Sequence, residues 1–94
     1  DRGNRLLDRV KVSQGGIHGT VADPKVIFRE ALEKRASSVL LCHNHPSGQL
    51  RPSSEDITLT NKLVEGGRYL DIVVQDHLIV GSTGYFSFAD NGQL

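Results

Sequence analysis

One short apolar run limits what this chain can fold into more than any other feature of its sequence. The run, Ser38-Val39-Leu40-Leu41-Cys42-His43, has no apolar partner at helical spacing on either side. Such a run is typical of a strand that is buried on both faces. We therefore expect a buried strand here, which delivers the residues that follow it into a loop.

The segments before and after this run carry helix signals. Asp23-Pro24 supplies an N-cap with proline at the first helical position, which predicts a helix from about 24 to 36. A second helix is expected from Ser53 to about Gly66, where Gly66-Gly67 would end it. The apolar stripes of the two helices are Val26, Ile27, Ala31 and Leu32 in the first, and Ile57, Leu59, Leu63 and Val64 in the second.

Other short apolar segments predict further strands. Leu6 to Val12 and Ile17 to Val21 are joined by Ser13-Gln14-Gly15-Gly16, which suggests a hairpin. Asp76 and the turn Gly81 to Gly84 separate three closing strands, which we expect at 72–74, 78–80 and 85–88. The sum is an α/β fold, a mixed sheet with flanking helices, in a single domain that spans residues 1–94.

Charge and cysteine content narrow the function. The 11 basic and 11 acidic side chains cancel, so no basic stripe gathers phosphates and DNA binding is disfavoured. The single cysteine, Cys42, cannot form an internal disulfide, which favours a reducing, cytoplasmic setting. We expect Cys42 to be buried by packing, since its neighbour His43 would point to the opposite face of the strand and could not activate it.

The chain has the features of a soluble fragment. No apolar run approaches the roughly 18 residues that a membrane helix requires, and the N-terminus lacks the apolar stretch of a signal peptide. The turn-like start Asp1-Arg2-Gly3-Asn4 carries no initiator methionine, which suggests a piece cut from a longer protein.

Two histidines follow the central strand at a spacing that suits a metal ion. His43 and His45 are two residues apart and so point to the same side of an extended chain. Glu55 and Asp56 arrive in the first turn of the next helix and bring a carboxylate ligand close. Two imidazoles and a carboxylate leave a fourth tetrahedral position open, as in a catalytic zinc site. Taken alone, Ser53-x-x-Asp56 is also a helix-capping pattern, and a lone histidine is more often a packing residue.

Together these residues spell His43-x-His45-x7-Ser53-x-x-Asp56, which resembles the JAMM motif of the MPN-type metalloproteases. The whole chain resembles the RadC family more closely. The residues that carry this likeness are Asn4-Arg5-Leu6, His43-Asn44-His45-Pro46-Ser47-Gly48, Asp76-His77-Leu78-Ile79-Val80-Gly81 and Tyr85-Phe86-Ser87-Phe88.

The resemblance implies a JAMM/MPN-like, cytidine-deaminase-like three-layer architecture, with the chain as the C-terminal part of a longer RadC-like protein. It further implies one zinc ion per chain, held by His43, His45 and Asp56, with a water in the fourth place. Ser53 would be the catalytic residue that hydrogen-bonds this water or the developing oxyanion. The implied activity is that of a zinc-dependent metallopeptidase or isopeptidase, whose partner is a peptide or protein substrate.

The pattern departs from the JAMM motif at one position. The upstream glutamate that serves as general base in that family does not precede Leu6, and Glu55 lies about 100 degrees around the helix from Asp56. Either the glutamate belongs to a missing N-terminal part, or the chain binds metal without being a competent hydrolase. A protein-interaction module on the same fold and an accessory role in DNA repair remain as alternatives.

One more histidine stands near an acidic residue. His77 follows Asp76 before an apolar segment, so it either orients a metal ligand or simply pairs with the Asp76 carboxylate. We interpret His77 as structural.

Overall fold

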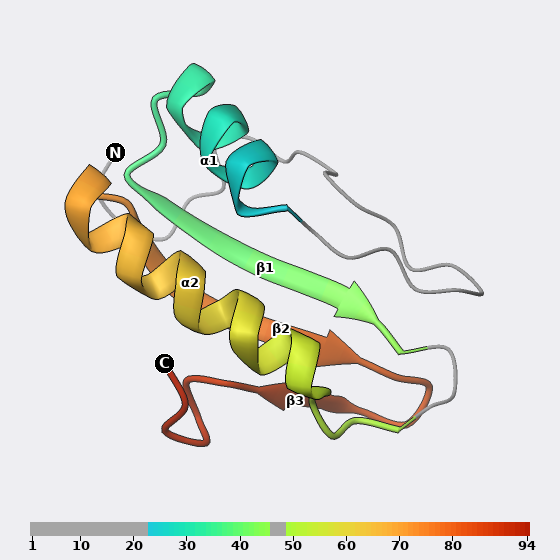
Figure 1. Ribbon diagram of the computed structural model, residues 1–94. Coiled ribbons are helices and arrows are strands. Elements are labelled where there is room, and N and C mark those ends of the chain that lie inside the picture. Colours follow the sequence, from blue (N-terminus) through green and yellow to red (C-terminus); the bar gives the residue numbers. More distant parts are fainter. Residues whose placement is uncertain (1–22, 46–48) are drawn as a thin grey trace.

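A computed structural model describes residues 23–45 and 49–94. In chain order the elements are α1 (Pro24–Glu33), β1 (Ser38–Asn44), α2 (Ser54–Leu70), β2 (Val73–Val80) and β3 (Tyr85–Ser87) (Figure 1). The three strands form one sheet in the order β1-β2-β3, in which β1 and β2 are parallel and β2 and β3 antiparallel. The predicted α/β class with a mixed sheet is confirmed. The hairpin expected over residues 6–21 lies outside the described residues.

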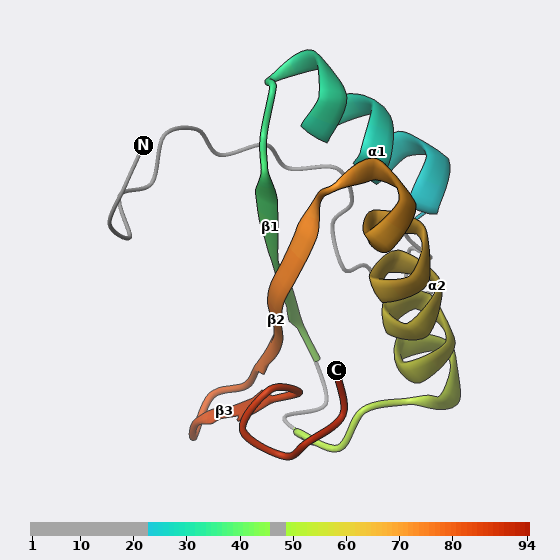
Figure 2. The same cartoon turned by 90° about the vertical axis from the view of Figure 1, so that its left-hand side faces the viewer.

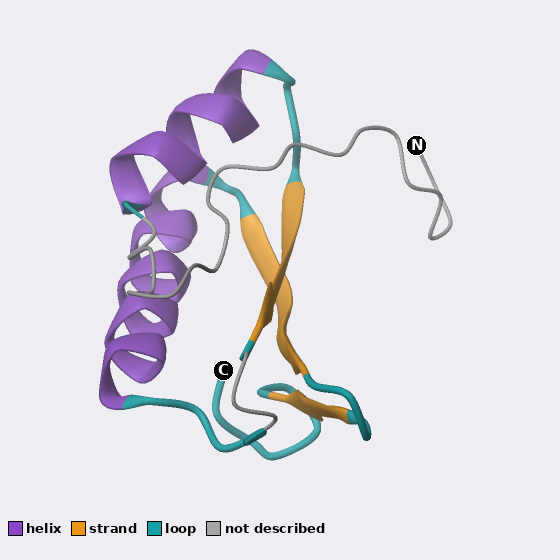
Figure 3. Cartoon of the chain, turned by 90° about the vertical axis from the view of Figure 1, so that its right-hand side faces the viewer, coloured by secondary structure: helices purple, strands orange, loops and turns teal. Residues whose placement is uncertain are grey.

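Both helices lie on the same side of the sheet, as two opposite side views make plain (Figures 2 and 3). The core between these layers is built on Ile27, Leu63 and Val74, with partly buried Phe28, Val39, Leu41, Leu59 and Val64 packed against it. Within the described ranges no element covers the opposite face, so the third layer of the expected architecture stays a prediction. Neither described helix is long and apolar enough to cross a membrane.

Strand β1 is buried on one face only, which corrects two expectations from the sequence. Val39, Leu41 and His43 are partly buried on the side of the helices. Leu40 on the other side is 56% exposed, and the free Cys42 is exposed as well. The burial predicted for Cys42 is therefore wrong in the described part of the molecule. Every second residue of a strand points to the same face, so Cys42 shares the face of Leu40, while the helices pack against the opposite face.

Helix α1 begins where Asp23 and Pro24 predict, with the Asp23 carboxylate accepting from the Lys25 backbone N–H at 2.9 Å. It ends at Glu33, three residues earlier than expected. Arg35 adopts a left-handed conformation with φ 56°, and the chain closes with Ala36 N–H to Ala31 O at 2.8 Å and Arg35 N–H to Leu32 O at 3.1 Å. This pair of bonds is a Schellman motif, and arginine in the usual place of glycine leaves little sign of it in the sequence.

Helix α2 runs through the two glycines that were expected to end it. A Cβ on Gly67 would lie 2.1 Å from the backbone oxygen of Ile72, and one on Gly66 would lie 2.9 Å from the Phe28 ring. The glycines therefore allow the close approach of neighbouring chain rather than stopping the helix. The helix ends instead at Leu70, and its C-cap residue Asp71 is left-handed with φ 57°.

Strand β2 joins two segments that the sequence analysis separated at Asp76. Val39 pairs with Val74, but the next residue, Leu40, pairs with Asp76, so Gln75 is an extra residue in β2. This bulge shifts the alternation: Val74, His77 and Ile79 are the buried side chains of the strand. Without it, residue 76 rather than residue 77 would share the face of Val74. The bulge thus turns His77 toward the helices.

Candidate metal centre

Three polar residues meet between the end of β1 and the start of α2. His43 is in the last part of β1, and His45 is the first residue after this strand. Their ring centroids are 4.8 Å apart. The Asp56 carboxylate lies between them. His43 Nε2 is 3.2 Å from Asp56 Oδ1, and His45 Nε2 is 3.1 Å from Asp56 Oδ2. The structure therefore brings the three side chains predicted as metal ligands to one place.

Asp56 is held by the N-cap of α2. Ser53 Oγ accepts the Asp56 backbone N–H at 3.0 Å, and Asp56 Oδ2 accepts the Ser53 backbone N–H at 2.8 Å. This reciprocal capping box is the structural interpretation of the Ser-x-x-Asp pattern. A side-chain hydrogen bond from the Ser53 hydroxyl also stabilises the ionised Asp56 carboxyl, so Ser53 both caps the helix and supports the carboxylate.

The distances suit a tetrahedral metal ion. Ligand bonds of about 2.0–2.1 Å at tetrahedral angles put neighbouring donor atoms about 3.3 Å apart. The two histidine-to-carboxylate distances of 3.2 and 3.1 Å are close to this value. The side chains of His43, His45 and Asp56 are 27%, 17% and 13% exposed, so the group is partly open to solvent. The two histidine-to-carboxylate distances are therefore compatible with a metal ion at a place that is partly open to solvent.

The second nitrogen of each histidine also has a partner. His45 Nδ1 lies 2.7 Å from the backbone oxygen of Gln49, to which it can only donate. A neutral His45 therefore carries its hydrogen on Nδ1, and Nε2, at 3.1 Å, hydrogen-bonds Asp56 Oδ2 only when it carries a hydrogen as well. His43 Nδ1 lies 3.0 Å from Nε2 of His77. Such outer contacts are the usual way in which proteins orient metal-binding histidines.

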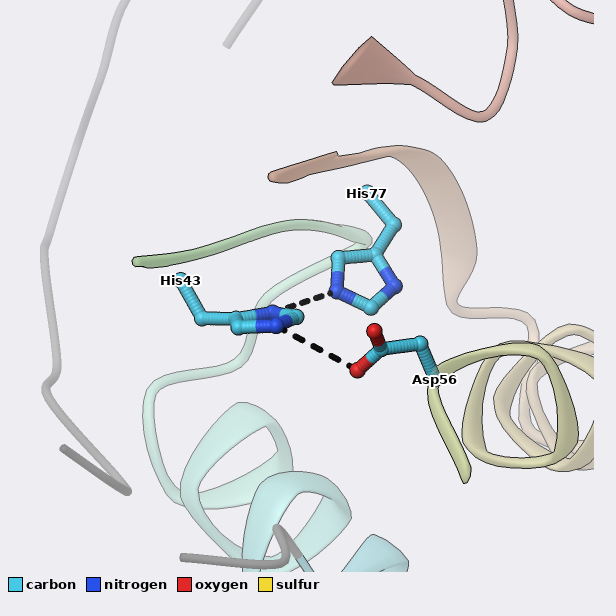
Figure 4. Close-up of side chains that lie close together, drawn as sticks. All are labelled: His43, Asp56 and His77. Atoms are coloured by element: carbon cyan, nitrogen blue, oxygen red, sulfur yellow. Dashed lines mark hydrogen bonds and ion pairs between the residues drawn. The ribbon is translucent and has the colours of Figure 1, made fainter. Parts of the chain in front are cut away.

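His77 contributes more to this site than the sequence analysis assigned to it. His77 is 1% exposed, and its Nε2 lies 3.0 Å from His43 Nδ1 (Figure 4). His43, Asp56 and His77 form a group whose candidate ligand atoms all lie within 4.8 Å of one another and could hold a metal ion. The contact that the structure places between His77 and the Asp76 carboxylate runs through the backbone N–H of His77, at 2.7 Å.

Burial and neighbouring charge set the ionisation of these groups. Burial lowers the pKa of His43, with a smaller effect of the same sign from His45 and an opposing one from Asp56. Burial, together with the charge of His43, lowers the pKa of His77 to about 4. Burial works against ionisation of Asp56, but the hydrogen bonds from Ser53 and the two histidines hold the pKa of its carboxyl below the ordinary value. Neutral imidazoles beside a carboxylate are the protonation states that metal binding needs.

No described glutamate joins this group. Glu55 is exposed, and its carboxylate accepts a hydrogen bond from Ser54 Oγ at 3.3 Å. This agrees with the helical geometry that turns residue 55 away from Asp56. The described part of the chain therefore holds the candidate ligands and Ser53 but no carboxylate base beside them.

The fold and this cluster define a small α/β domain whose histidine and aspartate side chains could hold a metal ion. The chain belongs to the RadC-like JAB domain family, whose model matches residues 1–93. This agrees with the resemblance read from the sequence.

Relatives carry names that state no activity. The UPF0758 protein of Flavobacterium johnsoniae is 44% identical over 89 residues, which cover 95% of this chain and 39% of the relative. That of Geotalea uraniireducens is 40% identical over 94 residues, covering 100% of this chain and 41% of the relative. That of Methanosarcina mazei is 44% identical over 92 residues, covering 98% and 40%. The chain thus spans about two fifths of the length of the curated relatives it matches.

Asp76 supports His77 from the far side of β2 and should make stability depend on pH. Its carboxylate accepts from Ser87 Oγ at 2.5 Å and from the Ala89 backbone N–H at 2.9 Å. Although burial opposes ionisation, these bonds hold the pKa of Asp76 below its ordinary 3.8. The Asp76 carboxyl therefore binds a proton more readily in the unfolded chain than in the folded one. Its contribution to stability is complete above the ordinary pKa of 3.8 and is lost as pH falls through the lower pKa of the folded state.

We therefore expect Asp76→Asn to lower the free energy of unfolding at neutral pH by about 1–3 kcal/mol, the usual contribution of hydrogen bonds to a charged group. The same variant should show a shallower loss of stability than the wild type below about pH 4. Urea unfolding at neutral pH and near pH 3 measures both effects. Asp90→Asn, an exposed change in the neighbouring turn, is the control. An acid loss as steep in Asp76→Asn as in the wild type would contradict the assignment.

Proposed function

We propose that this domain is the metal-binding core of a zinc-dependent hydrolase that cleaves a peptide or isopeptide bond. The observation that carries the proposal is the convergence of two imidazole nitrogens on the two oxygens of Asp56, at 3.2 and 3.1 Å. Nitrogen donors with one carboxylate are a typical ligand set of catalytic zinc. Membership of the RadC-like JAB family supports the same reading.

We assign the ligands to His43 Nε2, His45 Nε2 and the Asp56 carboxylate, rather than to His77. The two nitrogens of one imidazole point in diverging directions, and in His43 one faces Asp56 while the other faces His77 (Figure 4). A metal bound to His43 Nε2 and Asp56 would therefore use the nitrogen of His43 that does not face His77. His77 is also almost fully buried, whereas a catalytic metal must stay open to substrate.

When bound, zinc would lower the pKa of a coordinated water toward neutrality and polarise the carbonyl of the bond to be cut. Asp56 enters this site already ionised, because Ser53 holds its carboxylate with hydrogen bonds. The Ser53 hydroxyl, which hydrogen-bonds the Asp56 carboxyl here, would turn its hydrogen toward the carbonyl oxygen as that oxygen becomes negative. Hydrolysis would then proceed without a covalent intermediate on the protein.

Proton transfer needs a base that the described residues do not supply. We propose that it is a glutamate upstream of this chain, as the JAMM resemblance implies. The relatives are more than twice as long as this chain, so there is room for such a residue in a longer protein of this kind. The 94-residue chain should accordingly bind zinc and hydrolyse poorly, while a chain extended upstream to include the glutamate should hydrolyse.

The two alternatives from the sequence have less support. An interaction module would have no need for two histidines and a serine placed around one aspartate. A role in DNA repair would have to rest on contacts other than long-range attraction, since the basic and acidic residues of the chain balance. A cytoplasmic protein or peptide substrate remains our proposal for the partner.

Zinc uptake tests the proposed site directly. Asp56→Asn keeps an oxygen that accepts the Ser53 N–H, so the helix cap survives, but it removes the anionic ligand. We expect one zinc ion per chain in the wild type and none in this variant, by elemental analysis after equilibration with zinc and removal of the excess. Glu55→Gln makes the same change of charge in the same helical turn and should retain its zinc.

The zinc proposal is wrong if the wild type takes up no zinc after metal-replete purification. It is equally wrong if Asp56→Asn and Glu55→Gln hold the same amount.

The proposed role of Ser53 separates catalysis from stability. Ser53→Ala removes an N-cap and should cost about 1 kcal/mol of unfolding free energy. It should slow turnover by about 100-fold to 1,000-fold, because a donor to the developing oxyanion is lost. Ser53→Thr keeps both the cap and the hydroxyl and should restore most of the activity.

Turnover is measured with the upstream-extended chain on peptide and isopeptide substrates, and stability by urea unfolding. Equal activity of Ser53→Ala and the wild type at matched zinc content would remove Ser53 from the mechanism.

A further inference from the structure

We infer that His77 and Thr60 form a positioning relay that keeps the ring hydrogen of His43 on Nδ1 and so presents the lone pair of His43 Nε2 to the metal. The inference rests on the proposed metal site. It gives a role to a buried histidine that the proposed ligand set leaves out. Neither residue would touch the metal or the substrate.

The direction of each hydrogen bond follows from the Asp56 backbone oxygen, which ends this series of contacts. Thr60 Oγ1 lies 2.7 Å from the backbone oxygen of Asp56 and 2.6 Å from His77 Nδ1. A carbonyl oxygen can only accept, so the hydroxyl hydrogen of Thr60 is used there. His77 Nδ1 must then donate to Thr60 Oγ1, because the hydroxyl has no second hydrogen to give.

This assignment fixes the other nitrogen of His77. A buried neutral imidazole carries one hydrogen, so with Nδ1 protonated its Nε2 is an acceptor. The nearest ring nitrogen to that Nε2 is His43 Nδ1, at 3.0 Å, which must therefore donate. A neutral His43 then has its lone pair on Nε2, the nitrogen 3.2 Å from Asp56 Oδ1, with which it forms an ion pair only when protonated.

The relay is needed because His43 and His45 are supported differently. The partner of His45 Nδ1 is a backbone carbonyl, which by its chemistry permits a single direction of donation. The partner of His43 Nδ1 is another imidazole, which accepts or donates according to its own tautomer. The Thr60 hydroxyl, which donates to the α2 backbone, fixes the tautomer of His77 and through it the tautomer of His43.

Packing holds the relay in place. The His77 ring stacks on Phe88 with centroids 4.6 Å apart and an angle of 6° between the planes. Phe88 is fully buried, and its backbone N–H donates to the His77 backbone oxygen at 3.1 Å. Thr60 is also fully buried and sits one helical turn after Asp56. A ring held in this way keeps its two nitrogens toward Thr60 and His43.

The test reads ring tautomers in the metal-free chain and zinc affinity separately. Long-range ¹H–¹⁵N correlation spectra should show His43 and His77 each with the hydrogen on Nδ1. Thr60→Val removes the hydroxyl at nearly constant shape and should give mixed tautomers at both rings and a zinc affinity lower by about 10-fold to 100-fold. Thr60→Ser should restore both readouts. Thr58→Val, an exposed threonine of the same helix, should change neither.

The two proposals fail in different ways. A His43 ring with its hydrogen on Nε2 in the metal-free chain, or equal zinc affinity in Thr60→Val and Thr58→Val, overturns the relay and leaves the zinc site standing. Direct coordination of zinc by His77 Nε2, seen in the ¹⁵N spectrum of the loaded chain, also overturns it. A wild-type chain that binds no zinc overturns the proposed function and the relay together.

Discussion

The hydrogen bonds between Ser53 and Asp56 hold the carboxylate around which the rest of the site is arranged. Two bonds at the start of α2 fix Asp56 while the same carboxylate faces both His43 and His45. The N-terminus of a helix favours a negative charge, so the position of Asp56 helps to keep it ionised. The Ser53-x-x-Asp56 pattern was open to two interpretations, a helix cap and part of a metal site. In the structure the two are compatible, because the cap holds the carboxylate that faces the histidines.

The sheet supplies the other half of the site through a local irregularity. The extra residue Gln75 turns His77 to the face of the helices, where it meets Thr60, Phe88 and His43. Its neighbour Asp76 points the other way and ties β2 to β3 and the turn that follows. A bulge that re-aims a side chain next to a functional site is a common device in sheets. Here it provides a buried partner for His43, which lies near the end of β1.

Much of this could be predicted from short-range patterns. The spacing of His43 and His45 and the N-caps at Asp23 and Ser53 follow from local geometry, and each lies where the pattern placed it. The motif was also sufficient to suggest the family, which the comparison supports. Local rules worked at the helix starts but not at the end of α1, where Arg35 takes the left-handed place that glycine usually has.

The other errors came from contacts between distant residues. Gly66 and Gly67 carry a stop signal for a helix, yet they serve the approach of Phe28 and of the Ile72 backbone. The bulge at Gln75 depends on pairing with β1, so His77 could not be placed from its own segment. One signal for the relay was present, because Thr60 stands four residues after Asp56, on the same face of the helix, at a position that the apolar stripe would otherwise fill.

A crystal of the zinc-loaded chain, measured on both sides of the zinc absorption edge, tests the central claim most directly because anomalous scattering locates the metal without reference to the protein. The account predicts a zinc peak bonded to His43 Nε2, His45 Nε2 and a carboxylate oxygen of Asp56, with His77 outside bonding distance. A peak bonded to His77, or no peak near Asp56, would contradict it.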